Sequence, residues 1–238
     1  MDETRQALLE RYRGLRVTDV SDGIDYMGLW DRGNMSPDIR PLWRDIEGFS
    51  HRIYGFAHTV RFGPTNRPIT PRNPEEASEF IRSWYRDLAQ GPHRDQIQEG
   101  DMIVIDGQDL DVGYIGSNNA LSWIAAGAVG AVTNGGCRDT DELIKQKVPV
   151  YSRLITKTIR PGRLELIDEG RPITVGGVLV RPGDLVVADG DGVVVVPIEV
   201  AEKVAEYAWI VAEGDKAGRR ALYKKVGLPL DDTVGADE

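Results

Sequence analysis

The sequence predicts an α/β or α+β domain with a mixed central sheet. Helical and strand-forming segments alternate through the middle of the chain, and short Val-rich segments separated by turn residues cluster near its end. With 238 residues, 41% of them hydrophobic and 28% charged, the chain can bury one sizeable core. We therefore expect a single domain over 1–238, with a helical segment at 1–27 and a helix and tail at 198–238.

The first half of the chain contains helical and strand-forming segments separated by irregular stretches. Pro74 suits the first turn of a helix, and apolar residues then recur on one face as far as Leu88. The apolar run "GDMIVIDG" lies between turn residues and predicts a short buried strand. The expected helices cover 3–13, Thr18 or Asp19 to Met27, and 74–90, and the expected strands cover 53–62 and 100–107.

The second half alternates more regularly. We expect helices at 117–128 and 139–146 and strands at 129–134 and 148–153. Valines interrupted by Gly, Pro and Asp turns predict short strands and hairpins over 173–197. Apolar residues on one face predict a last helix at 198–213, and the acidic tail from Gly227 is expected to be loose.

Charge and cysteine content narrow the range of functions. Lys and Arg number 29 against 38 Asp and Glu, a net charge of −9, which argues against a broad nucleic-acid surface but leaves room for a small anionic substrate. The single Cys137 rules out an intramolecular disulfide and a multi-cysteine zinc site. No apolar run reaches the roughly 18 residues of a membrane span, and the first residues do not resemble a signal peptide, so we expect a cytoplasmic protein with no membrane partner.

The first candidate site is Arg138-Asp139, which follows the stretch "AVTNGG" and Cys137. One interpretation is structural, because Asp139 and Glu142 have the spacing of a capping box at a helix start. The other is functional, because side chains at the carboxyl end of a strand face the usual ligand crevice of an open α/β sheet. There an arginine fork can hold a carboxylate, and an aspartate can hold Mg²⁺ or Mn²⁺.

The second candidate is the stretch Gly116, Ser117, Asn118 and Asn119. Ser117 can be the N-cap of the next helix. Alternatively, Gly116 lets a ligand approach the backbone, and the free amides of residues 117–119 receive its carboxylate. Gly116 and Arg138 lie 22 positions apart, the length of one helix plus one strand, so both bends can return to the same sheet edge. The sequence therefore predicts one pocket formed by both.

The sequence pattern gives weaker support to the other candidate site residues. His51, His58 and His93 lack metal-ligand spacing, so no catalytic role is assigned to them. Asp189 and Asp191 match only a fragment of a calcium-binding loop, and we expect them to close a hairpin instead.

Three stretches together resemble the RraA-like family: Gly116 to Asn119, "GAVGAVTNGGCRD" (127–139) and "PGDLVVADGDGVVVVP" (182–197). This family includes 4-hydroxy-4-methyl-2-oxoglutarate aldolases, also called class II pyruvate aldolases, and regulators of ribonuclease E activity. The resemblance covers roughly residues 15–200. It implies a swivelling β/β/α sandwich assembled as a homotrimer or a hexamer.

The resemblance also implies roles for the two candidate stretches. The positions matching Gly116, Ser117, Asn118 and Asn119 bind substrate in the aldolases. The position matching Arg138 binds the oxo-acid carboxylate and stabilises the enolate, and the position matching Asp139 ligates a divalent metal. Ser117 departs from the family pattern, because aldolases commonly carry an acidic residue there that serves proton transfer.

Two classes of function follow. The leading hypothesis is a Mg²⁺- or Mn²⁺-dependent lyase acting on a small 2-oxo acid, by retro-aldol cleavage that releases pyruvate or by decarboxylation of oxaloacetate. The competing hypothesis is a non-catalytic regulator that binds a protein partner. A third keeps the metal pocket but acts on a sugar-derived acid. A methyltransferase is disfavoured, because no glycine-rich loop lies between a strand and a helix with an acidic residue after it.

Overall fold

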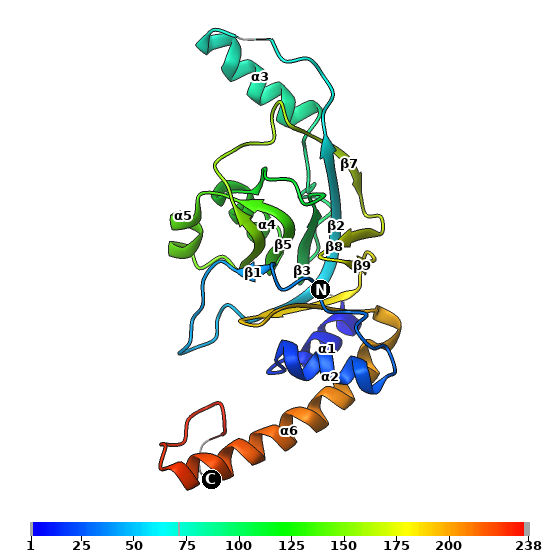
Figure 1. The fold of residues 1–238 in the computed structure, drawn as a ribbon. Coiled ribbons are helices and arrows are strands. Elements are labelled where there is room, and N and C mark those ends of the chain that lie inside the picture. Colours follow the sequence, from blue (N-terminus) through cyan, green and yellow to red (C-terminus); the bar gives the residue numbers. More distant parts are fainter. Residues whose placement is uncertain (1, 71, 236–238) are drawn as a thin grey trace.

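Helices and strands alternate along the chain much as the sequence predicts (Figure 1). The computed structural model describes residues 2–70 and 72–235. The helices are α1 (Glu3–Tyr12), α2 (Val17–Tyr26), α3 (Pro74–Asp87), α4 (Ser117–Ala125), α5 (Thr140–Lys145) and α6 (Ala201–Val226), the last preceded by a 3₁₀ turn at Ile198–Val200. The strands are β1 (Arg40–Pro41), β2 (Ile53–Pro64), β3 (Asp101–Asp106), β4 (Gly113–Ile115), β5 (Gly130–Cys137), β6 (Val150–Ile155), β7 (Leu164–Glu169), β8 (Ile173–Val175), β9 (Val178–Val180), β10 (Leu185–Asp189) and β11 (Gly192–Val196).

The main sheet is mixed, as predicted. Its strand order is β1-β6-β5-β3-β2-β10-β11, with β4 paired to β5 and β7 paired to β2. The pairings among β2, β3, β5 and β6, and that of β4 with β5, are parallel, whereas β1, β7, β10 and β11 pair antiparallel. Strands β8 and β9 form a separate hairpin. The parallel centre is the part of the sheet that positions the candidate site.

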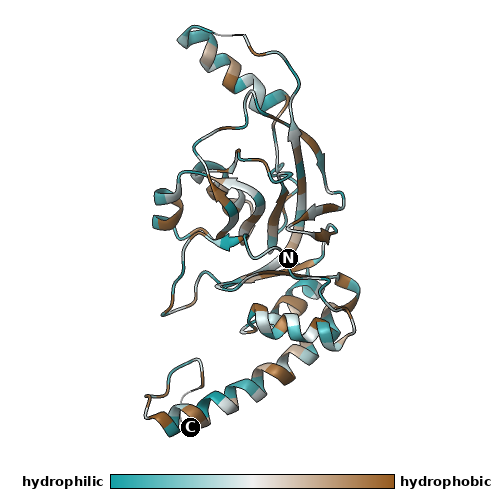
Figure 2. Cartoon of the chain, viewed as in Figure 1, coloured by the Kyte–Doolittle hydropathy of each residue, from teal (hydrophilic) through white to brown (hydrophobic). Residues whose placement is uncertain are grey.

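The Val-rich strands β10 and β11 are buried along their whole length. Alternate side chains of these strands enter two different core clusters, because successive residues of a strand point to opposite faces. Leu185 and Val187 pack with α1, α2 and α6, whereas Val186 and Ala188 pack toward β8 and β9. Figure 2 shows hydrophobic residues on the strands and also on the helices that pack against them.

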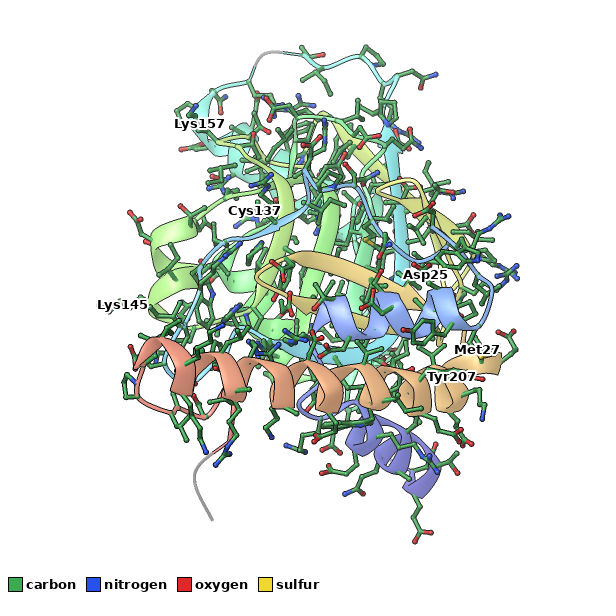
Figure 3. All side chains as sticks on the ribbon, turned by 60° about the horizontal axis from the view of Figure 1, so that its bottom comes forward. Asp25, Met27, Cys137, Lys145, Lys157 and Tyr207 are labelled. Carbon is green, nitrogen blue, oxygen red and sulfur yellow. The ribbon has the colours of Figure 1, made fainter. Side chains whose placement is uncertain are left out.

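Helix α2 packs closely on α6, and Figure 3 shows Tyr207 of α6 near the end of α2 that carries Asp25 and Met27. Gly23 allows this approach, because a Cβ there would lie 2.8 Å from the Val204 carbonyl oxygen. The Tyr26 and Tyr207 rings meet edge-on with centroids 6.1 Å apart. This helical layer covers β10 and β11 on the side away from the candidate site (Figure 1).

The C-terminal region corrects two expectations. Helix α6 continues to Val226 instead of ending near 213, and it projects from the body of the molecule (Figure 1). Its second half is rich in Lys, Arg and Ala, which favour helix without needing a buried face. Residues 227–235 fold back on α6 rather than being loose, with Val234 buried and Arg220 donating a 3.0 Å hydrogen bond to the Gly235 carbonyl. Residues 236–238 of the predicted tail lie outside the described residues.

The strand at 129–134 is longer than predicted. β5 continues through Gly135 and Gly136 to Cys137, so these glycines do not form the turn. A Cβ on Gly136 would lie 2.9 Å from the Val112 carbonyl oxygen, and one on Gly135 would collide with the Tyr114 ring. Both glycines therefore serve the close approach of β4, a strand that the sequence did not indicate.

Within the described ranges, no helix combines the length and apolar character needed to cross a membrane.

Candidate active site

Two neighbouring parallel strands end at the same edge of the sheet, and the candidate residues follow them directly. Strand β4 pairs with β5 so that Ile115 lies opposite Cys137. The amide of Arg138 then donates a 2.8 Å hydrogen bond to the Ile115 carbonyl. Gly116 and Arg138 consequently leave the sheet side by side, with α4 and β5 forming the connection between them.

Asp139 does not cap its own helix. It occupies the N-cap position of α5 with φ 56° and ψ 43°, and its side chain makes no capping hydrogen bond. N-cap residues ordinarily adopt an extended backbone, whereas this left-handed one turns the carboxylate toward the start of α4. There Oδ2 accepts hydrogen bonds from the Ser117 amide at 3.2 Å and the Ser117 hydroxyl at 3.4 Å. The capping-box interpretation is therefore wrong.

The start of α4 corrects a second expectation. Gly116, not Ser117, is the N-cap residue, and Ser117 is the first residue of the helix. A Cβ on Gly116 would lie 2.8 Å from Asp139 Oδ2, so glycine makes room for the carboxylate. Because the Ser117 amide already binds Asp139, it is not free for a ligand, contrary to our expectation. The amides of Asn118 and Asn119 make no hydrogen bond to any other described residue.

Arg138 and Asp139 form an ion pair at the surface of the site. The Arg138 Nε donates to Asp139 Oδ1 over 3.0 Å, and both side chains are about one-third exposed. Partial burial raises the pKa of Asp139, but hydrogen bonds from Arg138 and Ser117 lower it more, so the carboxyl is ionised at neutral pH. Neither terminal nitrogen of Arg138 has a partner in the described part of the chain. The outer edge of the guanidinium is therefore available to an anion.

A cavity of about 570 Å³ opens in front of this pair. Its wall includes residues from α4, from the end of β5, and from segments that the sequence did not associate with the site. Ser117 is not part of the wall, because it faces Asp139. The polar and charged residues of the wall that matter here are Asn118, Asn119, Arg138, Asp139, Arg94 and Arg160.

Arg94, Arg160 and Tyr85 were missed by sequence reasoning. Tyr85 lies in α3 and Arg94 in the segment after it, so the end of the α3 region forms the rim of the cavity. Arg160 lies between β6 and β7 in "KTIRPG", where no motif distinguishes it from a surface turn. Among the residues that the structure describes, three arginines and one carboxylate line the cavity, so its wall has a positive balance of charge in a protein of net charge −9.

The donor set that the described residues place on the cavity wall consists of oxygen atoms and holds no cluster of metal ligands. Among the described residues no three His, Cys, Asp or Glu side chains group together as metal ligands. Asp139 stands as the single carboxylate, with the amide side chains of Asn118 and Asn119 on the same wall. Such a set fits Mg²⁺ or Mn²⁺, which keep most of their waters and accept few protein ligands, and does not fit a tetrahedral zinc site.

The remaining candidates lie elsewhere. His51 accepts a hydrogen bond from the Asp45 amide, and His58 lies 2.6 Å from Glu169. None of the three histidines lines the cavity. Asp189 accepts a 2.8 Å hydrogen bond from the Asp191 amide at the β10–β11 turn, which confirms the expected hairpin.

Comparisons with known proteins agree with this picture. A sequence model of the RraA-like family, described as Aldolase/RraA, matches residues 17–195. A protein of Deinococcus radiodurans named putative 4-hydroxy-4-methyl-2-oxoglutarate aldolase is 36% identical over 178 residues, covering 74% of this chain and 98% of the relative. A Halalkalibacterium halodurans protein of the same name is 27% identical over 231 residues, covering 95% and 93%. Protein DlpA of Legionella pneumophila is 25% identical over 203 residues, which are 85% of this chain but only 29% of that longer protein.

The fold is also that of solved structures. Streptomyces coelicolor RraAS2, described as an unusual member of the RNase ES inhibitor RraA protein family, superposes with a TM-score of 0.71 at 23% identity. The match covers 92% of this chain and 97% of RraAS2. This likeness confirms the fold that the sequence resemblance implied.

Proposed function

This chain belongs to the Aldolase/RraA family, and on that premise we propose that it is a divalent-metal-dependent lyase acting on a 2-oxo acid. The observation that carries the proposal is the unpaired outer edge of Arg138 beside the ionised Asp139, both on one cavity wall. The aldolase names of the Deinococcus and Halalkalibacterium relatives support the same reaction class.

The proposed reaction is a retro-aldol cleavage of a 4-hydroxy-2-oxo acid. The C3–C4 bond breaks as the C4 hydroxyl gives its proton to water and C4 becomes a carbonyl carbon. The electron pair of the bond collects on the oxo-acid fragment as an enolate, which takes a proton from water and becomes pyruvate. Arg138 holds the oxo-acid carboxylate, and the free amides of Asn118 and Asn119 stabilise the developing negative charge. Asp139 would hold Mg²⁺ or Mn²⁺, which supplies Lewis-acid stabilisation of that charge when bound.

Ser117 stands where the aldolases commonly carry an acidic residue for proton transfer, and this difference bears on which of the two reactions is faster. The cavity wall has no carboxylate besides Asp139 among the described residues, so it offers no second carboxylate to accept the hydroxyl proton as a base. Decarboxylation of oxaloacetate passes through the same enolate but needs no such base. We therefore propose oxaloacetate decarboxylation as an accompanying activity, and as the faster one.

Pyruvate release from 4-hydroxy-4-methyl-2-oxoglutarate and from oxaloacetate tests this proposal. We expect turnover to need Mg²⁺ or Mn²⁺ and to stop with EDTA. Arg138→Ala and Asp139→Ala should each lower turnover by about 100-fold or more, the usual cost of removing a group that stabilises an enolate-like charge.

Asp141→Ala is the matched control, because Asp141 is an exposed acid in the first turn of α5 and lies outside the cavity. It should leave turnover unchanged. No pyruvate from either substrate with either metal, or equal rates for all three variants, would overturn the lyase proposal. The first result would favour the non-catalytic regulator.

We also propose that the chain assembles as a homotrimer or hexamer. Large apolar side chains on the projecting α6 support association, because Ile210, Leu222 and Val226 are each exposed. Light scattering should give a mass of three or six times 26.3 kDa. A monomeric mass would contradict this.

A further inference from the structure

Arg160 is a fully buried charged residue in the wall of the cavity. Only 2% of its surface is exposed, although the residue lines a cavity that is open to solvent. Its guanidinium lies over the Phe62 ring, 4.4 Å from the centroid. Burial lowers the pKa of Arg160 to about 10, so the group remains charged at neutral pH.

The hydrogen bonds of Arg160 connect the segments that surround the cavity. Nη1 donates to the carbonyls of Ala89 at 3.3 Å and Gly91 at 2.7 Å, in the segment that follows α3. Nη2 donates to the carbonyl of Tyr114 in β4, two residues before Gly116. Arg160 thus fixes the rim to the strand that positions the candidate active site.

No carboxylate balances this charge. Arg160 forms no ion pair with a described residue, and its Nε has no hydrogen-bond partner among them. The titratable groups that face it are the phenols of Tyr85 from α3 and Tyr114 from β4, and neither is a carboxylate. Carbonyl dipoles and an aromatic face compensate a buried cation only in part, so an anion in the adjoining cavity would stabilise it further.

We propose that Arg160 makes this cavity a carboxylate-binding site even without metal, and that it positions the substrate's carboxylate end against Arg138. The positioning role rests on the proposed lyase function, whereas metal-free binding does not. Because the charge is buried, solvent and salt screen it less than they screen the exposed Arg94.

Oxalate binding by the full chain, stripped of metal with EDTA and then dialysed, tests the proposal. Trp123 lines the cavity, so tryptophan fluorescence can follow binding, with calorimetry as a second measurement. We expect Arg160→Met to weaken oxalate binding by about tenfold or more, as when a charged hydrogen-bond donor is lost. Arg163→Met is the matched control, since Arg163 lies three residues away, is exposed, and lines a different cavity. It removes the same net charge and should change binding less than about twofold.

Arg160→Lys keeps the test decisive if the Met variant does not fold. A buried ammonium without a carboxylate partner has a lowered pKa. Oxalate binding by this variant should therefore weaken as the pH rises from about 6 to about 9, while wild-type binding stays nearly constant. A folded Arg160→Met with wild-type affinity, a pH-independent Arg160→Lys, or a wild-type protein that binds oxalate only with metal would each overturn the proposal. None of these measurements requires turnover, so failure of the lyase function is seen separately in the pyruvate assay.

Discussion

Gly116 leaves room for the carboxylate that the site depends on, because a Cβ there would lie 2.8 Å from Asp139 Oδ2. Gly116→Ala should push that carboxylate out of its hydrogen bonds with Ser117. We expect pyruvate release to fall by about 100-fold, since displacements near 1 Å can cost that much. The fold should persist, because the backbone at Gly116 is extended with φ −133°.

Gly214→Ala is the control for this substitution. Gly214 lies inside α6 with open space around its Cα, so Ala should stabilise the helix by about 0.5–1 kcal/mol and leave the rate unchanged. Full activity of Gly116→Ala would show that the position of the Asp139 carboxylate does not matter.

Asp139→Asn separates the charge of this residue from its shape. Asn tolerates the left-handed backbone at φ 56° as Asp does, and its amide oxygen can still accept from the Ser117 amide. The melting temperature should therefore change little. Mn²⁺ affinity, measured by electron paramagnetic resonance, should fall at least about tenfold, because the substitution removes the one carboxylate that the described residues place on the cavity wall, the proposed metal ligand. Equal Mn²⁺ binding by both proteins would place the metal elsewhere.

At the scale of elements, local patterns predicted the parts of the fold whose hydrophobic residues repeat regularly. The Val-rich hairpin β10–β11 and the succession α4–β5–α5 are examples. Strand β4 was missed because it has three residues, and β7 because "LELIDE" alternates weakly and pairs with the distant β2. The proximity of Gly116 and Arg138 could be predicted, because one helix plus one strand between them returns the chain to the same edge of a parallel sheet. The place of Arg160 in the cavity wall could not be predicted, because the segment between β6 and β7 reaches the cavity only through tertiary packing.

Helix α3 leads into the segment that forms most of the cavity rim, and Trp84 is one of the residues that attach this helix to the sheet. Trp84 is the buried residue of this helix, and its indole nitrogen donates a 2.8 Å hydrogen bond to the Leu164 carbonyl of β7. Trp84→Ala should cost about 3–5 kcal/mol in unfolding free energy and release the rim before the sheet unfolds. Hydrogen exchange should then increase over 74–94 first. Ile81→Ala, on the more exposed part of α3, should change exchange there much less.

At the scale of the whole molecule, a buried ionic network joins strands that are far apart in the chain. His58 of β2 lies 3.6 Å from Asp101 at the start of β3 and 2.6 Å from Glu169 at the end of β7. Arg5 of α1 donates to Asp101, and His93, next to the cavity rim, contacts Glu169. The network thus connects the N-terminal helix, the sheet and the segment after α3.

This network predicts a loss of stability at alkaline pH. Burial lowers the pKa of His58, but hydrogen bonds to Asp101 and Glu169 outweigh it and raise the pKa from 6.5 to about 9. A raised pKa stabilises the fold fully below pH 6.5, and this stabilisation is lost as the pH rises through about 9. Urea unfolding should show the wild-type protein losing on the order of 3 kcal/mol relative to His58→Gln across that window.

Other ionisable groups of the network act in a different pH range. The pKa values of Asp101 and Glu169 are lowered, so their contribution is lost in acid, below the window of His58. Burial lowers the pKa of His51, so that residue also acts only below pH 6.5. A stability advantage of wild type over His58→Gln that shrinks only above pH 6.5 therefore reports on His58. Parallel stability curves from about pH 6 to about pH 9.5 would show that the two carboxylates do not hold His58 in its charged form.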